Sequence, residues 1–354
     1  MPPDIAPPDA GRLRARAELD RLWRRGADFL GCRYAIMGGA MSWVSERHLV
    51  SAISNAGGFG VIACGSMGPE GLAAEIAATQ ALTARPFGVN LITMHPLLDD
   101  LVRVCLDAGV GHIVLAGGIP PGNALRAVKN GGARLIAFAP ALVLAKRLLR
   151  SGVDALVIEG SEAGGHIGPV SLTVLAQEIL PHVRDVPVFV AGGLGRGEAV
   201  LSFLEMGAAG AQLGTRFAAA AESIAHPAFK QAFIRASARD ALPSVQLDER
   251  FPVIPVRGLV NAGTKEFLAH QAATLRRFQA GELSRDAAQL AIEHFWAGAL
   301  RRAVIEGDVE HGSVMAGQSV CMVTAVQPVA EIMEELIEQA VAVLADRFSL
   351  AYAD

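Results

Sequence analysis

Short apolar runs recur along the first two thirds of the chain, and helix-compatible segments lie between them. The runs are apolar at consecutive positions rather than at every second one, which is typical of parallel strands buried on both faces. They follow one another at intervals of about 20 to 33 residues. They begin near Arg33 (RYAIM), Phe59 (FGVI), Phe87 (FGVNL), His112 (HIVL), Arg134 (RLIAF), Asp154 (DALVI), Pro187 (PVFVA) and Ala208 (AAGAQLG).

The intervening segments predict helices, for example over 46–55, 69–81 and 141–151. Several are followed by a glycine, where a left-handed residue commonly ends a helix; these are Gly57, Gly109, Gly131, Gly152 and Gly207.

Eight strand–helix units are the number that closes a (β/α)8 TIM barrel, so we predict an α/β fold of that kind. An open doubly wound sheet is the alternative. The glycine-rich sequence GFGVIA (58–63) argues against that alternative, because it precedes and forms its strand, whereas a dinucleotide-binding fingerprint follows a strand and opens a helix.

The strand–helix rhythm stops after residue 236. We therefore predict an N-terminal arm and helix (1–30), the barrel (31–235), a smaller and mainly helical substrate lobe (236–325), and a C-terminal helix that returns to the barrel (326–354). Residues 1–10 are proline-rich and are expected to be disordered. The lobe is expected to contain an irregular segment (244–260) and helices over 265–280 and 284–306, and the C-terminal helix is expected over 329–347.

The predicted helix over 12–30 carries several arginines around an apolar set. We interpret it as a helix that lies over the main domain; contact with a nucleic acid or a lipid is the alternative. The whole chain has 31 basic and 35 acidic residues, so its charge gives no case for a nucleic-acid partner.

The remaining composition indicates a folded protein of a reducing compartment. Hydrophobic residues make up 52% of the chain, which excludes a disordered protein. The longest apolar run, 135–145, is too short to span a membrane, and the N-terminus lacks the apolar core of a secretory signal. The four cysteines are widely spaced and form no CxxC pair, which supports neither disulfides nor a zinc ribbon. We expect a cytoplasmic protein without a membrane partner.

Two glycine-rich loops follow the seventh and eighth predicted strands, which is where barrels of this kind bind phosphate groups. They read AGGLGRG (191–197) and QLGTR (212–216). Glycines let backbone N–H groups approach an anion closely, so we predict phosphate binding there, with simple tight turns as the alternative. No GxxxxGK[ST] sequence is present, which excludes a P-loop nucleotide site.

The loop after the sixth predicted strand, EGSEAGGHIG (159–168), places His166 among glycines at the barrel mouth. Histidine suits proton transfer because its ordinary pKa lies near neutrality. A structural role is the alternative. The other histidines show no HxH or HExxH spacing, so no metal site is predicted, and the absence of a GxSxG sequence argues against a serine hydrolase.

Five segments together carry a family resemblance: SNAGGFG (54–60), GVN (88–90), EGSEAGGHIG (159–168), AGG (191–193) and QLGTRF (212–217). They resemble the nitronate monooxygenase (2-nitropropane dioxygenase) family and its close relatives, the FMN-dependent enoyl-ACP reductases. The resemblance runs from about residue 33 to 235, with weaker matches at 222–226 and 316–318. Many nitronate monooxygenases have glutamine where this chain has Glu159, and glutamate there resembles the reductases. The first loop, IMGGAMSW, also departs from the commoner QGPM pattern.

The resemblance implies FMN as the phosphate ligand and His166 as the catalytic base that removes an α-proton from a nitroalkane. Met37, Gly38 and Gly39 would lie against the isoalloxazine ring, and Lys146 would lie near the flavin. The other implied FMN contacts are Asn90, Glu159, Gly164, Gly192, Gly193, Gln212, Leu213, Gly214 and Thr215.

The activity that the resemblance implies is oxidation of alkyl nitronates or nitroalkanes, with O2 as co-substrate. An NAD(P)H-dependent reductase of enoyl thioesters or quinones is one alternative, and a flavin-binding partner subunit without turnover is another. The partners expected are therefore small molecules, and a homodimer remains open.

Overall fold

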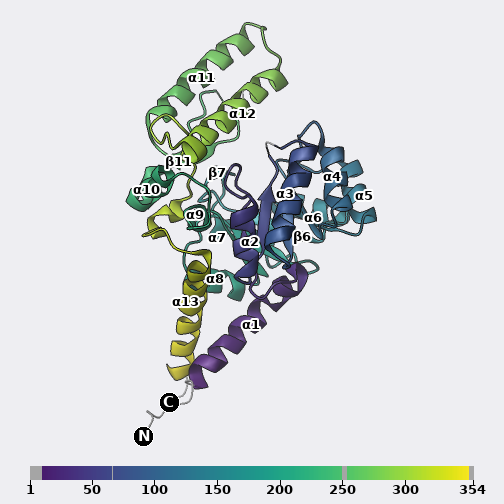
Figure 1. Cartoon of the computed structure of the whole chain (residues 1–354), viewed down its shortest axis with the longest axis vertical. Helices are drawn as coiled ribbons and strands as arrows, with labels where there is room; N and C mark the ends of the chain where they lie inside the picture. Colours follow the sequence, from purple (N-terminus) through teal and green to yellow (C-terminus); the bar gives the residue numbers. More distant parts are fainter. Residues whose placement is uncertain (1–9, 66, 249–252, 351–354) are drawn as a thin grey trace.

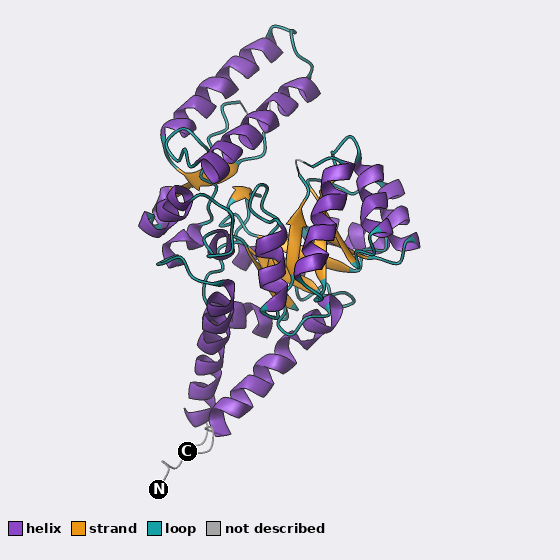
Figure 2. Cartoon of the chain, in the orientation of Figure 1, coloured by secondary structure: helices purple, strands orange, loops and turns teal. Residues whose placement is uncertain are grey.

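A computed structural model describes residues 10–65, 67–248 and 253–350. Its central sheet contains eight parallel strands in the order β1-β9-β8-β6-β5-β4-β3-β2, and Figure 2 shows them at the centre of the molecule with helices around them. Their bounds are β1 (Ile36–Gly38), β2 (Gly60–Ala63), β3 (Phe87–Ile92), β4 (His112–Ala116), β5 (Arg134–Phe138), β6 (Ala155–Glu159), β8 (Val188–Ala191) and β9 (Gly210–Leu213).

The two ends of this sheet meet. A parallel bridge joins Met37 to Phe59, and the N–H of Gly38 donates to the carbonyl of Phe59. Strands that follow one another in the chain are therefore neighbours around a closed ring, with no point at which the strand order reverses. This confirms the (β/α)8 barrel and excludes the open doubly wound sheet.

Helices follow the strands and cover the outside of the barrel, as Figure 1 shows. The α-helices are α1 (Ala10–Leu30), α2 (Arg47–Asn55), α3 (Pro69–Leu82), α4 (Leu98–Asp107), α5 (Gly122–Asn130), α6 (Leu142–Arg150), α7 (Leu172–Ile179), α8 (Gly197–Glu205), α9 (Thr215–Ala218), α10 (Pro227–Arg235), α11 (Ala262–Gln279), α12 (Arg285–Arg301) and α13 (Val329–Leu350). The 3-10 helices are η1 (Ala238–Asp240) and η3 (Gln318–Met322), and η2 (Arg302–Glu306) is a π-helical turn that continues α12.

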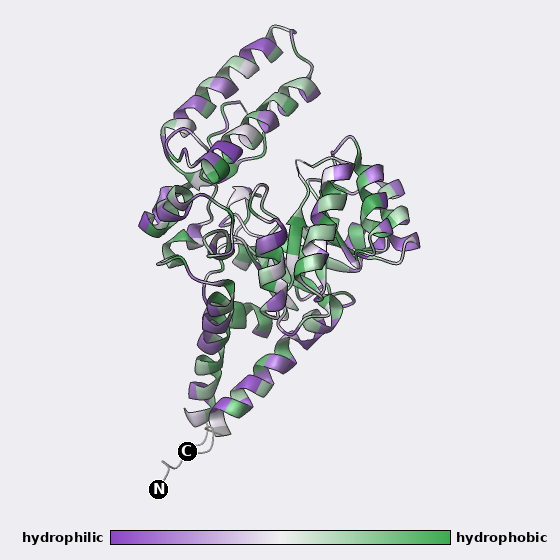
Figure 3. Cartoon of the chain, viewed as in Figure 1, coloured by the Kyte–Doolittle hydropathy of each residue, from purple (hydrophilic) through white to green (hydrophobic). Residues whose placement is uncertain are grey.

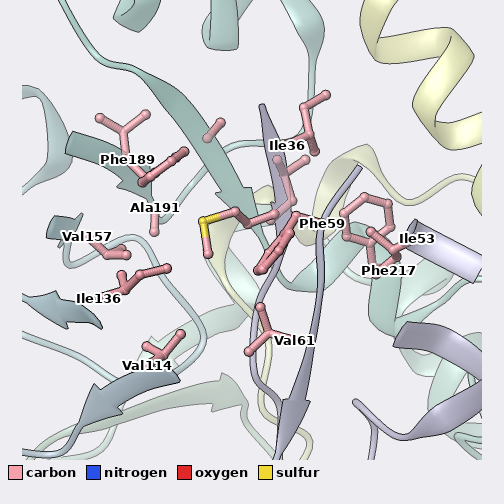
Figure 4. Packing of buried hydrophobic residues seen from close by; sticks show 14 of the residues in the cluster. Ile36, Ile53, Phe59, Val61, Val114, Ile136, Val157, Phe189, Ala191 and Phe217 are labelled. Atoms are coloured by element: carbon pink, nitrogen blue, oxygen red, sulfur yellow. The ribbon is translucent and has the colours of Figure 1, made fainter. Parts of the chain in front are cut away.

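Apolar side chains fill the barrel. Val114, Ile136 and Val157 on neighbouring strands point into the interior, where Phe189 joins them (Figure 4). The alternate residues of the same strands are also buried, against the helices, which is why these strands are apolar at consecutive positions. Each fully buried side chain of this size contributes about 1.5–3 kcal/mol.

The C-terminal end of α1 covers the amino-terminal end of the barrel. The carbonyl of Phe29 hydrogen-bonds His112 Nε2 at 2.9 Å and also accepts from the Arg134 guanidinium. Burial lowers the pKa of His112, so the ring is neutral at the bottom of the barrel. At its other end, α1 pairs with α13 through Arg12 and Glu338. The arginines of α1 thus take part in packing within the chain.

Four of the five predicted glycine caps have left-handed backbone angles, with φ of +91° at Gly57, +72° at Gly109, +87° at Gly152 and +106° at Gly207. The prediction for Gly131 was wrong, because this residue has φ of −78° and Gly132, with φ of +78°, takes the left-handed position. Helix α5 therefore makes its turn one residue later than the sequence pattern indicated.

Residues 236–325 include a second, smaller sheet and a helical hairpin. Strands β10 (Ala241–Pro243) and β11 (Val256–Leu259) pair with each other, and β11 also pairs with β7 (Gly165–His166) from the loop after β6. The segment 244–260, expected to be irregular, thus contains a strand. One of its two partners, β7, lies far away in the sequence, so no local pattern marks that pairing. Residues 249–252 lie outside the described residues.

Helices α11 and α12 form the hairpin that projects from the barrel in Figure 1. Phe267 and Trp296 pack between them with ring centroids 4.0 Å apart, in an apolar cluster of its own. Hydrophobic and hydrophilic residues alternate along both helices in Figure 3, as expected for helices that bury one face only. Residues 1–9 of the segment expected to be disordered lie outside the described residues, and Ala10 begins α1.

None of the described helices is long and apolar enough to cross a membrane.

Candidate active site

The carboxyl ends of the strands bring several of the predicted site residues into one row. The register pairs Glu159 with Ala191, Ala191 with Gln212, and Gln212 with Met37 across four neighbouring strands. Glu159 lies two residues after Val157 and Ala191 two residues after Phe189, both of which face the interior in Figure 4. Because side chains alternate between the faces of a strand, this row faces into the barrel at its mouth.

Asn90 joins the same mouth from β3. It pairs with Val114, which Figure 4 places in the interior. Asn90 and Gln212 are 8% and 9% exposed. Within the described part of the chain, the side chains of Asn90, Gln212 and Glu159 make no hydrogen bond. Asn90 and Gln212 are almost fully buried and Glu159 is partly buried, but their polar atoms keep some contact with solvent, so the three side chains are available to a polar ligand at this opening.

Glu159 is the acid among these three side chains, and its pKa is strongly raised. Its side chain keeps partial contact with solvent but lies deep among protein atoms, and this burial raises its pKa to about 8. At neutral pH the Glu159 carboxyl group is therefore protonated in most molecules. In that form it can donate as well as accept a hydrogen bond. A neutral glutamic acid offers a ligand the same two kinds of contact that a glutamine would.

Replacing Glu159 with glutamine is expected to remove a pH dependence of stability. The folded state holds this proton more tightly than the unfolded state, in which the pKa is near 4.5, so the wild type loses stability as the pH rises from 4.5 towards 8. The loss from one such group approaches about 1.4 kcal/mol per pH unit. Denaturant unfolding at pH 5, 6, 7 and 8 would measure it, and parallel curves for wild type and E159Q would contradict the assignment.

The loop after β8 supplies two backbone donors. Gly192 and Gly193 have φ of +96° and +71°, and neither N–H has an acceptor among the described residues. A Cβ added to Gly193 would lie 2.9 Å from the Cβ of Glu162, so the loops after β6 and β8 can meet only because this residue is glycine. The two free N–H groups suit an anion.

Three further loops meet beside this turn. The N–H of Gly317 donates to Thr215 Oγ1 at 3.0 Å, and a Cβ on Gly164 would lie 2.5 Å from that same nitrogen. Gln318 donates its N–H to the carbonyl of Glu162 at 2.9 Å. The segment 316–318, which the sequence matched only weakly, therefore belongs to the same mouth as the loops after β6 and β9.

The remaining predicted residues are placed differently. Gly38 and Gly39 lie at the end of β1, where Gly39 N–H donates to the carbonyl of Leu213 at 2.8 Å. The side chain of Leu213 faces the helices, since it alternates with Gln212, and Gly214 follows as the N-terminal cap of α9. Lys146 is exposed in the second turn of α6, and no hydrogen bond or ion pair among the described residues joins it to the others.

His166 lies further out than the ring of polar side chains. It forms β7, which pairs antiparallel with β11 so that His166 lies opposite Val256. Its Nε2 lies 3.0 Å from Glu293 Oε2 on α12, and the two side chains are 44% and 34% exposed. The structure thus places this histidine between the barrel and the helical hairpin.

Two further residues at the mouth were not predicted from the sequence. Glu293 carried no local signal, because α12 comes more than a hundred residues after the loop it contacts. Trp43, in the loop after β1, has a φ of +66°, which a bulky residue rarely adopts, and its indole N–H is buried without a partner. The Arg301 guanidinium lies 5.8 Å from the Trp43 ring centroid.

Arg216, in the predicted phosphate loop, turns away from the mouth. Its guanidinium is buried and donates to Glu335 Oε2 on α13 at 2.7 Å and to the carbonyl of Met322 at 3.0 Å. The hydrogen bond from Arg216 to Glu335 is the main cause of the lowered pKa of Glu335. The arginine of the QLGTRF motif therefore holds α13 and η3 against the barrel.

One cavity lies apart from the mouth. A cavity of about 390 Å³ opens between the segments that precede β1, β2 and β3, at the amino-terminal end of the barrel, where side chains normally serve stability rather than chemistry. In the described ranges, no group of three or more His, Cys, Asp or Glu residues is arranged to hold a metal ion.

Comparison with known proteins agrees with this geometry. The family model for nitronate monooxygenase matches residues 24–102 and 98–339. A nitronate monooxygenase of Paraburkholderia phytofirmans is similar at 26% identity over 87% of this chain and 92% of that protein. A (3aS,4S,5R,7aS)-5-hydroxy-7a-methyl-1-oxo-octahydro-1H-indene-4-carboxyl-CoA dehydrogenase of Mycobacterium tuberculosis is 33% identical over 62% of this chain, and the match spans 62% of that protein's length.

Solved structures give the same grouping. FabK from Thermotoga maritima is similar with a TM-score of 0.81 and 33% identity, over 92% of this chain and 98% of that one. The nitroalkane oxidase of Streptomyces ansochromogenes is similar with a TM-score of 0.73 and 26% identity, over 91% and 99%. Since the family model covers well over half of the sequence, this chain belongs to the nitronate monooxygenase family of oxidoreductases, whose members are flavoenzymes.

Proposed function

We propose that this chain binds FMN at the barrel mouth and oxidises alkyl nitronates with O2. The observation that carries the proposal is the ring of polar side chains without partners, Asn90, Glu159 and Gln212, in a chain that the family model matches along most of its length. These groups fit the polar edge of an isoalloxazine ring. The free N–H groups of Gly192 and Gly193 fit a terminal phosphate.

FMN in this site would take up the electrons of the substrate and pass them to O2. The protein has to bind and orient the substrate and, for a neutral nitroalkane, to remove a proton from the α-carbon. His166 is the group proposed for that proton transfer, because its imidazole lies in the mouth loop and imidazole is a common general base. A nitronate has already lost this proton and needs no base. We propose that residues 236–325 form the substrate side of the mouth, with the barrel holding the cofactor.

A second function is favoured by one specific observation. FabK and the CoA dehydrogenase are each 33% identical to this chain, above the 26% of the nitronate monooxygenase. The name of the dehydrogenase contains a CoA thioester, and the sequence resemblance to FMN-dependent enoyl-ACP reductases implies a substrate of the same class. The second candidate is therefore an NAD(P)H-dependent FMN reductase of enoyl thioesters.

The experiment that separates the two candidates is anaerobic. The purified protein is expected to be yellow with non-covalent FMN, and adding an alkyl nitronate without oxygen is expected to bleach the flavin absorbance within one turnover. NADH and NADPH, added separately, are expected to leave it oxidised. Readmitting O2 should restore the absorbance and start turnover.

If NADH or NADPH bleached the flavin and the nitronate did not, the result would support the reductase function instead. A protein that retains FMN but is reduced by neither would be a flavin-binding subunit without turnover. Recovery of FAD, or of no flavin at all, would contradict the proposed cofactor.

A further inference from the structure

The His166 imidazole is held by a residue outside the barrel. Glu293 Oε2 lies 3.0 Å from Nε2, within hydrogen-bonding distance. Ionised carboxylates only accept hydrogen bonds, and a neutral imidazole has one N–H and one lone pair. A carboxylate this close to Nε2 favours the tautomer that carries its proton there, and that tautomer has its lone pair on Nδ1.

The backbone of His166 is fixed from the same side. Its strand pairs with β11 through Val256, and the N–H of Ile167 donates to the carbonyl of Pro255 at 3.0 Å. Arg257, next on β11, donates from Nε to the carbonyl of Ser161 at 2.9 Å. The ring and its backbone are thus both attached to residues 236–325, and the barrel alone does not set the position of this histidine.

Helix α12 is itself fixed across the mouth. Glu293 contacts the loop after β6, and two turns further along the same helix Arg301 lies against Trp43 in the loop after β1. The backbone at Trp43 is in a costly conformation that persists only where the surroundings hold it. Arg301 therefore gives α12 a second contact with the mouth, on a different loop from the one that Glu293 reaches.

We propose that Glu293 is a positioning residue for His166: it selects the tautomer with Nδ1 unprotonated, aims that nitrogen into the mouth, and stabilises the imidazolium formed on proton transfer. This rests on the proposed function for its catalytic meaning. In the step itself the α-carbon–hydrogen bond of the nitroalkane breaks, an Nδ1–H bond forms, and the electron pair stays on the substrate as the nitronate. A carboxylate on the far nitrogen favours this transfer because the ring gains a positive charge.

The other charged groups near the imidazole are bound to backbone groups. Arg257 on β11 is turned to the carbonyls of Ser161 and Ala241, and Glu162, in the same loop as His166, accepts from the N–H of Leu172. Among the described residues, Glu293 supplies the carboxylate that lies against the His166 imidazole.

The first test reads the tautomer and needs no turnover. In wild-type protein near pH 8, the 15N chemical shifts of the His166 ring are expected to be far apart, with Nε2 protonated and Nδ1 bare. In Glu293→Ala the two shifts are expected to move towards each other as the tautomers exchange. Asp286→Ala, which removes an exposed carboxylate from the first turn of the same helix, should leave them unchanged. Averaged shifts or a protonated Nδ1 in the wild type would overturn the proposal.

The second test compares two substrates in the variant. Glu293→Ala is expected to lower kcat for a neutral nitroalkane by about 10- to 100-fold, with an increased isotope effect for an α-deuterated substrate, and to leave nitronate oxidation near the wild-type rate. Glu293→Gln, whose amide oxygen can still accept from Nε2, is expected to keep the tautomer but to lose part of the rate. Equal losses on both substrates, or no loss on either, would overturn the proposal. A wild type that oxidises nitronate but no nitroalkane would do so as well.

The two tests separate this proposal from the proposed function. A wild type that oxidises neither substrate while its ring shows the expected tautomer would contradict the proposed function and retain Glu293 as the residue that sets the histidine. If the wild type oxidised its substrates as expected but showed averaged shifts for the His166 ring, the proposed function would be supported and the role of Glu293 contradicted.

Discussion

Replacing His166 with asparagine is expected to lower turnover of a neutral nitroalkane by about 10²–10⁴-fold, which is the usual contribution of a general base. The α-carbon proton has to leave before electrons can, and asparagine cannot accept it. Oxidation of the corresponding nitronate is expected to remain near the wild-type rate. Initial rates with both forms of one nitroalkane, measured at one pH and at equal FMN content, would show the separation.

The matched control is His294→Asn. His294 lies beside Glu293 on α12, is exposed, and carries the same change of side chain without touching His166. Its rates on both substrates are expected to stay at the wild-type level. Equal losses on both substrates in a His166→Asn protein that keeps its full FMN complement would refute the role as base, and would point to an effect of the imidazole on the flavin step.

The barrel could be predicted from the sequence because each of its strands is marked locally. A strand such as Ala155–Glu159 is buried on both faces, so its apolar run is continuous, and the helix that follows carries its own amphipathic pattern. Closure followed from the number of strands. The left-handed cap after α5 fell at Gly132 rather than Gly131 because two adjacent glycines can both adopt that conformation.

The barrel side of the candidate site was easier to predict from the sequence than the side formed by residues 236–325. Glu159 and Gln212 stand at the carboxyl ends of their strands and Asn90 lies in the second half of β3, so strand position and motif together placed them at one opening. The other side depends on contacts between distant segments. The pairing of β7 with β11, and the contact of His166 with Glu293, have no counterpart in hydrophobic periodicity, which reports only on neighbours along the chain.

Replacing Gly193 with leucine is expected to abolish FMN binding while the barrel stays folded. The residue has φ of +71°, and a Cβ there would lie 2.9 Å from the Cβ of Glu162, so the turn has to move and its free N–H groups leave the place proposed for the phosphate. The measurement is the ratio of FMN absorbance to protein absorbance after purification, with the near- and far-UV circular dichroism as the check on folding.

Gly109→Leu separates the loss of this site from backbone strain. Gly109 has φ of +72°, almost the same angle, but nothing lies within 4 Å of the added Cβ, and the residue follows α4 away from the mouth. This variant is therefore expected to lose a similar amount of stability and to keep its flavin. If both variants lost FMN in proportion to their loss of stability, the turn after β8 would act only as a connection. A fully yellow Gly193→Leu protein would place the phosphate elsewhere, because a side chain and a phosphate cannot share the space in front of these two N–H groups.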